Sequence, residues 1–142
     1  MNQKLINIES GGLRIEDFNI VLDNDLESVN SQIEQLWELQ EQRYGWDEYR
    51  ISSYEFEKDT LMINLLFQNR KLSIIQIYIK FHDHQEPLDW ESWTEEFESQ
   101  KLFKLQHWLR NQIGKKTEFK WGKIIAYRDK KGGFSNITIG KK

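Results

Sequence analysis

The stretch YRISSYEFEKDTLMINLLFQNRKLSIIQIYIKF, residues 49–81, decides the fold. Two of its segments carry apolar side chains at every second position, at Leu61, Ile63, Leu65 and Phe67 and again at Ile75, Ile77, Ile79 and Phe81. Because successive side chains of a strand point to opposite faces, this period of two predicts strands at 49–57, 60–68 and 72–81. The polar pairs Lys58-Asp59 and Asn69-Arg70 predict tight turns between them. The stretch is therefore expected to form an antiparallel meander with one strongly apolar face.

A helix is predicted before the meander, from about Leu26 to Tyr44. Its apolar residues recur at spacings of three and four, at Leu26, Val29, Ile33, Leu36, Trp37 and Tyr44, as on the buried face of an amphipathic helix. Asn24 and Glu27 approximate a capping box at its start, and Gly45 would end it. Ahead of this helix, residues 4–9 and 13–15 predict a short hairpin broken by Gly11-Gly12.

A second helix is predicted after the loop at 82–90. Ser92 and Glu95 form an S-x-x-E capping box, and Gly114 would end the helix. Its apolar stripe consists of Trp93, Phe97, Leu102, Leu105, Leu109 and Ile113. Strands at 117–128 and 134–139 follow, joined by the turn DKKGG at 129–133, and we expect the aromatic side chains of this hairpin to face inward (Phe119, Trp121, Tyr127 and Phe134).

The elements together predict an α+β fold in one domain that spans residues 1–142. We expect a single antiparallel sheet of about five to seven strands with two amphipathic helices packed on it, in the order β(β)-α-βββ-α-ββ. The length of 142 residues suits one ordinary domain. The strand at 134–139 is expected to have an unpaired edge, through which a homodimer would be possible.

Composition excludes several classes of protein. The chain has no cysteine, which excludes disulfides, thiolate metal sites and cysteine nucleophiles. It has no apolar run of the length needed to span a membrane. We therefore expect a cytoplasmic protein without membrane contact.

Charge is divided unevenly along the chain. Residues 1–100 hold 8 basic and 21 acidic side chains, whereas residues 101–142 hold 12 basic and 2 acidic ones. Two interpretations are open. The halves can neutralise each other inside the fold, or each can form a charged face for a partner of opposite sign.

The residues that usually carry catalysis or bind metals do not form a convincing site. His82-Asp83-His84 has ligand types, but all of them lie on one loop, so a solvated strand end is the better interpretation. Glu95-Glu96 lies in the first turn of a capped helix, where the helix dipole favours carboxylates, rather than across a cleft. We therefore predict no catalytic residue, no metal site, no cofactor and no enzyme activity.

Two acidic clusters that contain tryptophan predict a surface for a basic protein partner. The segment 86–98 has six carboxylates and no basic residue, and we predict partner contacts at Trp90, Glu91, Glu95 and Glu98. The second cluster follows the first predicted helix and comprises Glu41, Tyr44, Trp46, Asp47 and Glu48. Exposed aromatic rings would anchor the partner, and the carboxylates would steer it.

An alternative function is nucleic-acid binding by the C-terminal strands. Lysines and arginines interleave there with the aromatic residues, at Lys115, Lys116, Lys120, Lys123, Arg128, Lys130, Lys131, Lys141 and Lys142. A sheet that stacks bases on aromatic rings would have this pattern. The acidic remainder of the chain would oppose it through repulsion of phosphate.

The C-terminal hairpin also resembles a known family. Trp121-Gly122-Lys123-Ile124, followed by Asp129, Gly132-Gly133, Ser135, Ile137 and Ile139, is similar to the W-G-x-I strand, D-x-x-G turn and S-x-I-x-I strand of small bacterial immunity proteins from polymorphic-toxin systems of the contact-dependent inhibition type. The likeness covers about 20 of the 142 residues. It implies a cytosolic protein that binds a toxin domain and blocks it without catalysis, and it implies no particular binding residue.

Overall fold

The computed structural model describes residues 4–83, 94–129 and 134–141, and these contain two helices and nine strands. The helices are α1 (Leu26–Ile33) and α2 (Glu95–Ile113). The strands are β1 (Ile6–Asn7), β2 (Gly12–Ile15), β3 (Phe18–Val21), β4 (Glu38–Arg43), β5 (Trp46–Phe56), β6 (Asp59–Gln68), β7 (Lys71–Lys80), β8 (Gly122–Arg128) and β9 (Ser135–Lys141). The predicted α+β class is confirmed.

Six strands form one antiparallel sheet in the order β4-β5-β6-β7-β9-β8. The meander predicted from residues 49–81 is confirmed as β5, β6 and β7, with Ile63 directly opposite Ile77. The prediction of an unpaired edge at 134–139 is wrong, because β9 pairs with β7 on one side and with β8 on the other. The edge strands of this sheet are β4 and β8.

The first three strands form a separate small sheet, β1-β2-β3, instead of joining the large one. Polar contacts tie its start to the end of α2, where Lys4 Nζ donates to Asn111 O at 2.6 Å and Leu5 N donates to Gln112 Oε1 at 2.8 Å. Trp121 Nε1 donates to Ile8 O at 2.7 Å and so links the small sheet to the approach to β8. The small sheet therefore packs against the core as a separate sheet and does not extend the large one.

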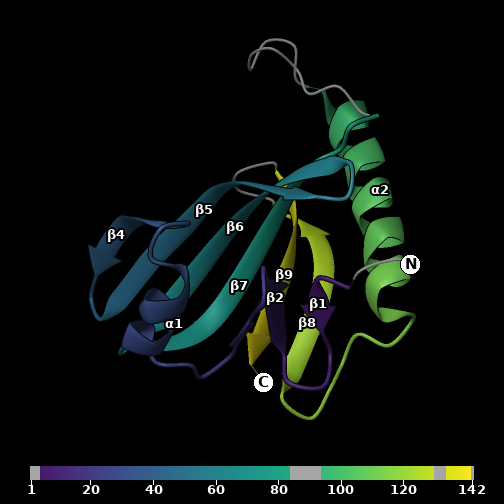
Figure 1. The fold of residues 1–142 in the computed structure, drawn as a ribbon. Coiled ribbons are helices and arrows are strands. Elements are labelled where there is room, and N and C mark those ends of the chain that lie inside the picture. The colour runs from purple at the N-terminus through teal and green to yellow at the C-terminus, as the bar shows by residue number, and fades with distance from the viewer. Residues whose placement is uncertain (1–3, 84–93, 130–133, 142) are drawn as a thin grey trace.

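The core lies on one face of the six-stranded sheet. α1 and the small sheet lie in front of that sheet, and α2 runs beside β8 (Figure 1). Ile63, Ile77 and Ile137 on three adjacent strands have no exposed surface, and Leu105 of α2 has none either. One continuous apolar cluster joins both helices to both sheets. None of the helices in the described ranges has the length and apolar character needed to span a lipid bilayer.

The first helix is much shorter than predicted. α1 ends at Ile33, and the chain reverses so that residues 38–43 form β4 against β5. Trp37 marks the reversal: its ring stacks on Tyr49 with centroids 4.2 Å apart, and its Nε1 donates to Asn30 Oδ1 at 2.9 Å. The N-cap is Asp25, not Asn24, whose Oδ1 accepts from Val21 N instead. Burial of one indole thus overrides the helical preference of the Gln- and Glu-rich segment that follows it.

The second helix differs from its prediction mainly in which residues it buries. Thr94 caps it, with its hydroxyl accepting from Phe97 N at 3.0 Å, and Gly114 ends it at φ 81° as predicted. The predicted cap Ser92 and the stripe residue Trp93 lie outside the described residues. The buried side chains are Glu98, Lys101, Leu105, Leu109 and Ile113, whereas Phe97 and Leu102 are half-buried.

The C-terminal hairpin buries only part of the aromatic set predicted to face inward, since Phe119 and Trp121 pack partly buried against the core. Ile124 is fully buried, whereas Tyr127 and Phe134 are exposed. Phe119 and Trp121 precede β8 rather than belonging to it, and their rings stack on each other with centroids 5.1 Å apart. Phe119 N donates to Gly122 O at 2.7 Å, and this turn ahead of β8 interrupts the alternation expected across residues 117–128.

Candidate protein-binding surface

The second predicted cluster lies on the hairpin of β4 and β5, at the outer end of the large sheet. Arg43 pairs with Trp46 across the hairpin, so Tyr44 and Gly45 alone form its turn. Both have positive φ, at 49° and 83°, as a two-residue turn that matches strand twist requires. Asn69 N, in the neighbouring turn between β6 and β7, donates to Gly45 O at 2.8 Å. This bond holds the hairpin tip against the sheet.

Tyr44 is the most exposed large hydrophobic residue in the described ranges, at 95%. A bulky residue at positive φ is uncommon because its Cβ crowds the backbone. Asn and Gly adopt that conformation at lower cost and are the usual residues of such a turn. Glu16, Glu57 and Asn69 adopt the same conformation at the first position of other tight turns of the chain, so it is the exposure of its ring that sets Tyr44 apart.

A groove with a volume of about 210 Å³ opens beside Tyr44. It is lined by Glu41, Arg43, Tyr44, Trp46, Asp47, Glu48 and Leu66. The register sets this arrangement. Glu41 lies opposite Glu48, which lies opposite Leu66, and Trp46 occupies the next position along β5 on the same face. The groove therefore has an apolar wall, formed by an indole and a leucine, and a rim of carboxylates.

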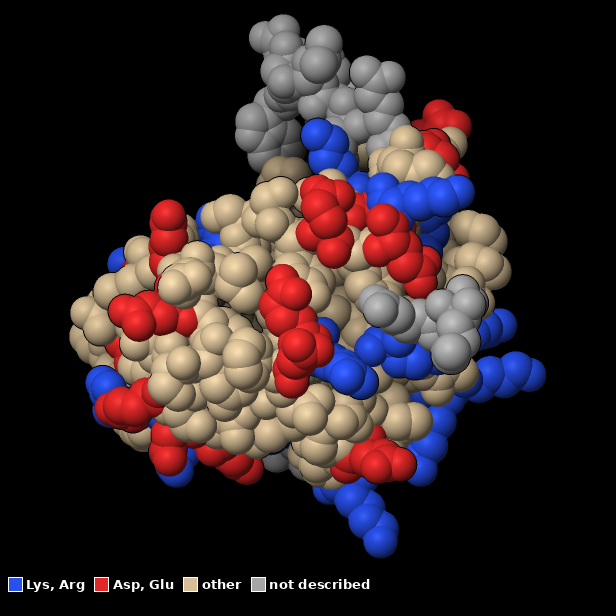
Figure 2. All heavy atoms as spheres, in the orientation of Figure 1, with Lys and Arg blue, Asp and Glu red and all other residues tan. Residues whose placement is uncertain are grey.

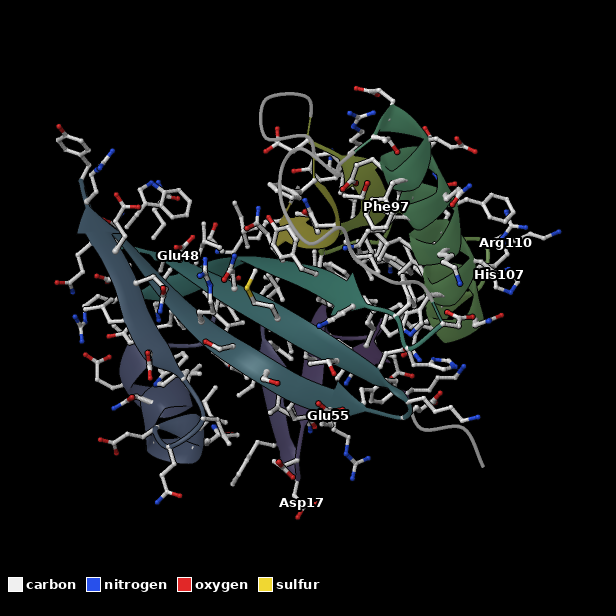
Figure 3. The ribbon with its side chains drawn as sticks, turned by 90° about the horizontal axis from the view of Figure 1, so that it is seen from above. Asp17, Glu48, Glu55, Phe97, His107 and Arg110 are labelled. Carbon is white, nitrogen blue, oxygen red and sulfur yellow. The ribbon has the colours of Figure 1, made fainter. Side chains whose placement is uncertain are left out.

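The carboxylates of the groove differ in their partners. Glu41 Oε1 lies 2.8 Å from Arg43 Nη2, and Asp47 Oδ1 accepts from Gln42 Nε2 at 2.8 Å. Glu48 has no ion pair or side-chain hydrogen bond with any residue in the described ranges. Glu48 projects from the β5 end of the sheet, away from α2 (Figure 3). It is the carboxylate in the groove best placed to meet a cation from outside.

Of the four partner contacts predicted in the first cluster, only Glu95 and Glu98 lie in the described residues, and neither is a free surface carboxylate. Glu95 accepts from Arg128, with Oε1 2.9 Å from Nη2 and a second contact through Oε2. The hydrogen bond from Arg128 holds the pKa of the Glu95 carboxyl below its usual value. Trp90 and Glu91 lie outside the described residues.

Glu98 was predicted to contact a partner, and this is wrong because its side chain is buried, with 1% of the residue exposed. Its Oε2 accepts from Ser135 N at 3.2 Å and from Ser135 Oγ at 2.9 Å. The carboxylate thus joins α2 to the start of β9. Ser135 is 37 positions away in the chain, and for this reason no local pattern could reveal the burial of Glu98.

Acidic and basic side chains are interspersed over the face that carries α1, with the basic ones gathered toward the edge formed by α2 and β8 (Figure 2). Ion pairs in the described ranges join the acidic first hundred residues to the basic remainder, among them Glu95 with Arg128, Asp83 with Lys104, and Asp23 with Lys141. These pairs support, in part, the interpretation that the halves neutralise each other. None of the residues that line the hairpin groove takes part in these three ion pairs.

Some of the residues considered for metal or nucleic-acid binding have partners within the protein. His82 Nδ1 lies 2.9 Å from Asp59 Oδ1, and His84 is outside the described residues. Within the described ranges no three His, Asp or Glu side chains gather as metal ligands. The indole of Trp121 covers Gly11 and stacks on Phe119, so these two rings are engaged within the protein.

No protein-family model matches this sequence, and comparisons with curated proteins and with solved structures found no match. The resemblance of the C-terminal hairpin to immunity proteins therefore stays a prediction. Among the predicted residues, Glu41, Trp46, Asp47 and Glu48 are brought together by the structure. Sequence reasoning missed Arg43 and Leu66 as members of the groove. Leu66 could have been found, since it is an apolar residue that lies off the alternating stripe of β6.

Proposed function

We propose that this chain is a protein-binding module that holds a basic partner at the β4–β5 hairpin, and that it serves as an immunity protein which blocks a toxin domain in the cytoplasm. The observation that carries the binding proposal is Tyr44, which is 95% exposed at the tip of an anchored turn beside a groove lined by Trp46. The assignment to immunity proteins rests on the resemblance of the C-terminal hairpin.

The hairpin has the features of a binding hot spot. Tyrosine and tryptophan dominate the energy of protein interfaces because they bury large areas and lose few rotamers. Glu41 and Glu48 flank Trp46 and would attract a basic surface during encounter. The Asn69–Gly45 hydrogen bond limits the motion of the tip, so little ordering would oppose binding.

Growth rescue tests this proposal. The proposal expects a toxin-like domain to be encoded next to this gene, and the test expresses that domain in a bacterial host, alone and together with this chain. We expect the domain to arrest growth and the chain to restore it. The double variant Tyr44→Ala, Trp46→Ala should bind the toxin domain more weakly by about 2 kcal/mol or more, which is roughly a thirtyfold rise in Kd, and should rescue poorly.

Phe103→Ala is the matched control. Phe103 is also a large exposed side chain, at 72%, but it lies on α2 at the other end of the molecule, so this variant should rescue like the wild type. Absence of growth arrest, or arrest that the wild-type chain does not relieve, would refute the immunity role. Equal rescue by the double variant would remove the hairpin from the interface.

A further inference from the structure

Arg43 already places a guanidinium at the groove. It lines the groove together with Trp46, its cross-strand neighbour. Its Nη2 lies 2.8 Å from Glu41 Oε1, and the two side chains are 69% and 53% exposed. Exposed ion pairs of this kind contribute little to stability. The contact is thus weak enough to open when a competing cation arrives.

The groove keeps an excess of negative charge with Arg43 in place. Glu41 and Glu48 are direct cross-strand partners, and like charges in this position repel each other. Arg43 compensates one of them. A second cation beside Glu48 would relieve the remaining repulsion, so the groove is complementary to a positively charged side chain.

The shape and lining favour arginine over lysine. A guanidinium is planar, stacks on an indole face and can donate to two carboxylates at once. Trp46 supplies the ring, and Glu41 and Glu48 supply carboxylates on the adjacent cross-strand pair of the same face. A lysine ammonium would satisfy the charge but not the planar stacking.

We infer that the groove binds an arginine side chain of the partner, and that Arg43 competes with it for Glu41. This inference rests on the proposed function and names the chemistry that the hairpin recognises. The inference is distinguished by the change in binding affinity that it predicts when Arg43 is removed. Removing a residue that lines a binding groove usually weakens binding, whereas removing an internal competitor strengthens it.

The test is an NMR titration of the whole ¹⁵N-labelled chain with the blocked tripeptide acetyl-Gly-Arg-Gly-amide at low salt. The indole N–H resonance of Trp46, assigned with Trp46→Phe, reports on the groove. We expect a saturable shift with Kd of roughly 1–10 mM, as suits a single side chain. The lysine tripeptide should bind less tightly, and the citrulline tripeptide, which is shaped like the arginine one but uncharged, should not shift the resonance.

Variants decide the role of each side chain. Arg43→Gln should bind the arginine tripeptide up to about fivefold more tightly, since the exposed pair it removes is worth no more than that. Glu48→Gln should bind it at least about threefold more weakly, because a charge-assisted hydrogen bond is lost. Glu96→Gln makes the same change at an exposed position on α2 and should leave binding unchanged.

Three results would overturn the inference. They are no saturable shift in either the wild type or Arg43→Gln, an equal shift with the citrulline tripeptide, and weaker binding by Arg43→Gln than by the wild type. None of them bears on growth rescue, which depends on the whole interface. A failed titration with successful rescue would leave the proposed function standing and reject only the arginine.

Discussion

At the scale of single residues, Tyr44 combines a positive φ with an almost fully exposed ring. The turn it occupies has φ 49° at this position, where a bulky side chain costs about 1–2 kcal/mol relative to the right-handed conformation. The side chain is almost fully exposed, so packing within the chain does not repay that cost. A contact made only in a complex would account for keeping tyrosine there.

Tyr44→Asn is predicted to raise the free energy of unfolding by about 0.5–1 kcal/mol, because Asn-Gly is the preferred pair for this turn. Urea unfolding measures the change. Tyr44→Phe keeps the ring and the strain, and its stability should equal that of the wild type. A less stable Tyr44→Asn variant would mean that the phenol stabilises the hairpin and is not reserved for a partner.

The residues of the hairpin cluster were grouped in the sequence by their proximity alone, and their contact with a partner stays a prediction. Glu41, Trp46 and Glu48 lie within eight positions of one another, and a tight hairpin joins them whichever way the rest of the chain folds. Glu98 failed because its environment is set by Ser135 on a distant strand. The charge and spacing of residues in the sequence do not distinguish a solvated carboxylate from a buried one that accepts hydrogen bonds from the start of a distant strand.

At the scale of elements, the meander was predictable and the segment before it was not. Strands β6 and β7 bury one face almost completely, so their alternation is plain in the sequence. Strand β4 is exposed at every position and is a strand only because β5 pairs with it. An edge strand without a buried face has no periodicity to detect, and its glutamates and glutamines favour a helix by propensity.

The pairing of β8 with β9 gives a matched pair of glycine variants. A Cβ at Gly122 would lie 1.9 Å from Gly140 O, whereas a Cβ at Gly140 would have no atom within 4 Å. Gly122→Ala should therefore force the strands apart and lower the free energy of unfolding by about 2–3 kcal/mol. Gly140→Ala should change it by less than about 1 kcal/mol.

Thermal or urea unfolding of both variants checks this prediction. If the two variants are equally stable, β8 can shift to make room for a Cβ at position 122 and still pair with β9. If Gly122 is required by packing, the Trp121-Gly122 part of the immunity-like pattern reports on how this hairpin is built. The resemblance to immunity proteins would then be evidence about how the hairpin folds rather than about which partner it binds.

At the scale of the whole molecule, charged side chains occur both in internal ion pairs and around the hairpin groove. The ion pairs Glu95–Arg128, Asp83–Lys104 and Asp23–Lys141 connect the acidic and basic parts of the chain. The hairpin groove keeps its carboxylates at the far end of the sheet from α2 (Figure 1). The ion pairs thus support the interpretation in which the halves neutralise each other, and a charged face for a partner stays a proposal.

The internal pairing predicts how stability depends on pH. The hydrogen bond from Arg128 lowers the pKa of the Glu95 carboxyl from its usual value of 4.5, so the ionised form is favoured in the folded state. The stabilisation from this group is complete above pH 4.5 and is lost as the pH falls through the lower pKa of the folded state. Glu95→Gln has no carboxyl to ionise, so the stability difference between wild type and variant should be largest near pH 7 and should shrink below pH 4.5.

Urea midpoints of both chains, measured between pH 7 and pH 3, provide the test. Glu96→Gln is the control, since Glu96 is an exposed neighbour on the same turn of α2, and its midpoints should follow those of the wild type. Added salt should also narrow the difference at pH 7, because Glu95 is exposed to solvent and its attraction to Arg128 is screened. A difference that stays constant across the pH range would mean that Glu95 stabilises the fold through packing rather than through its charge.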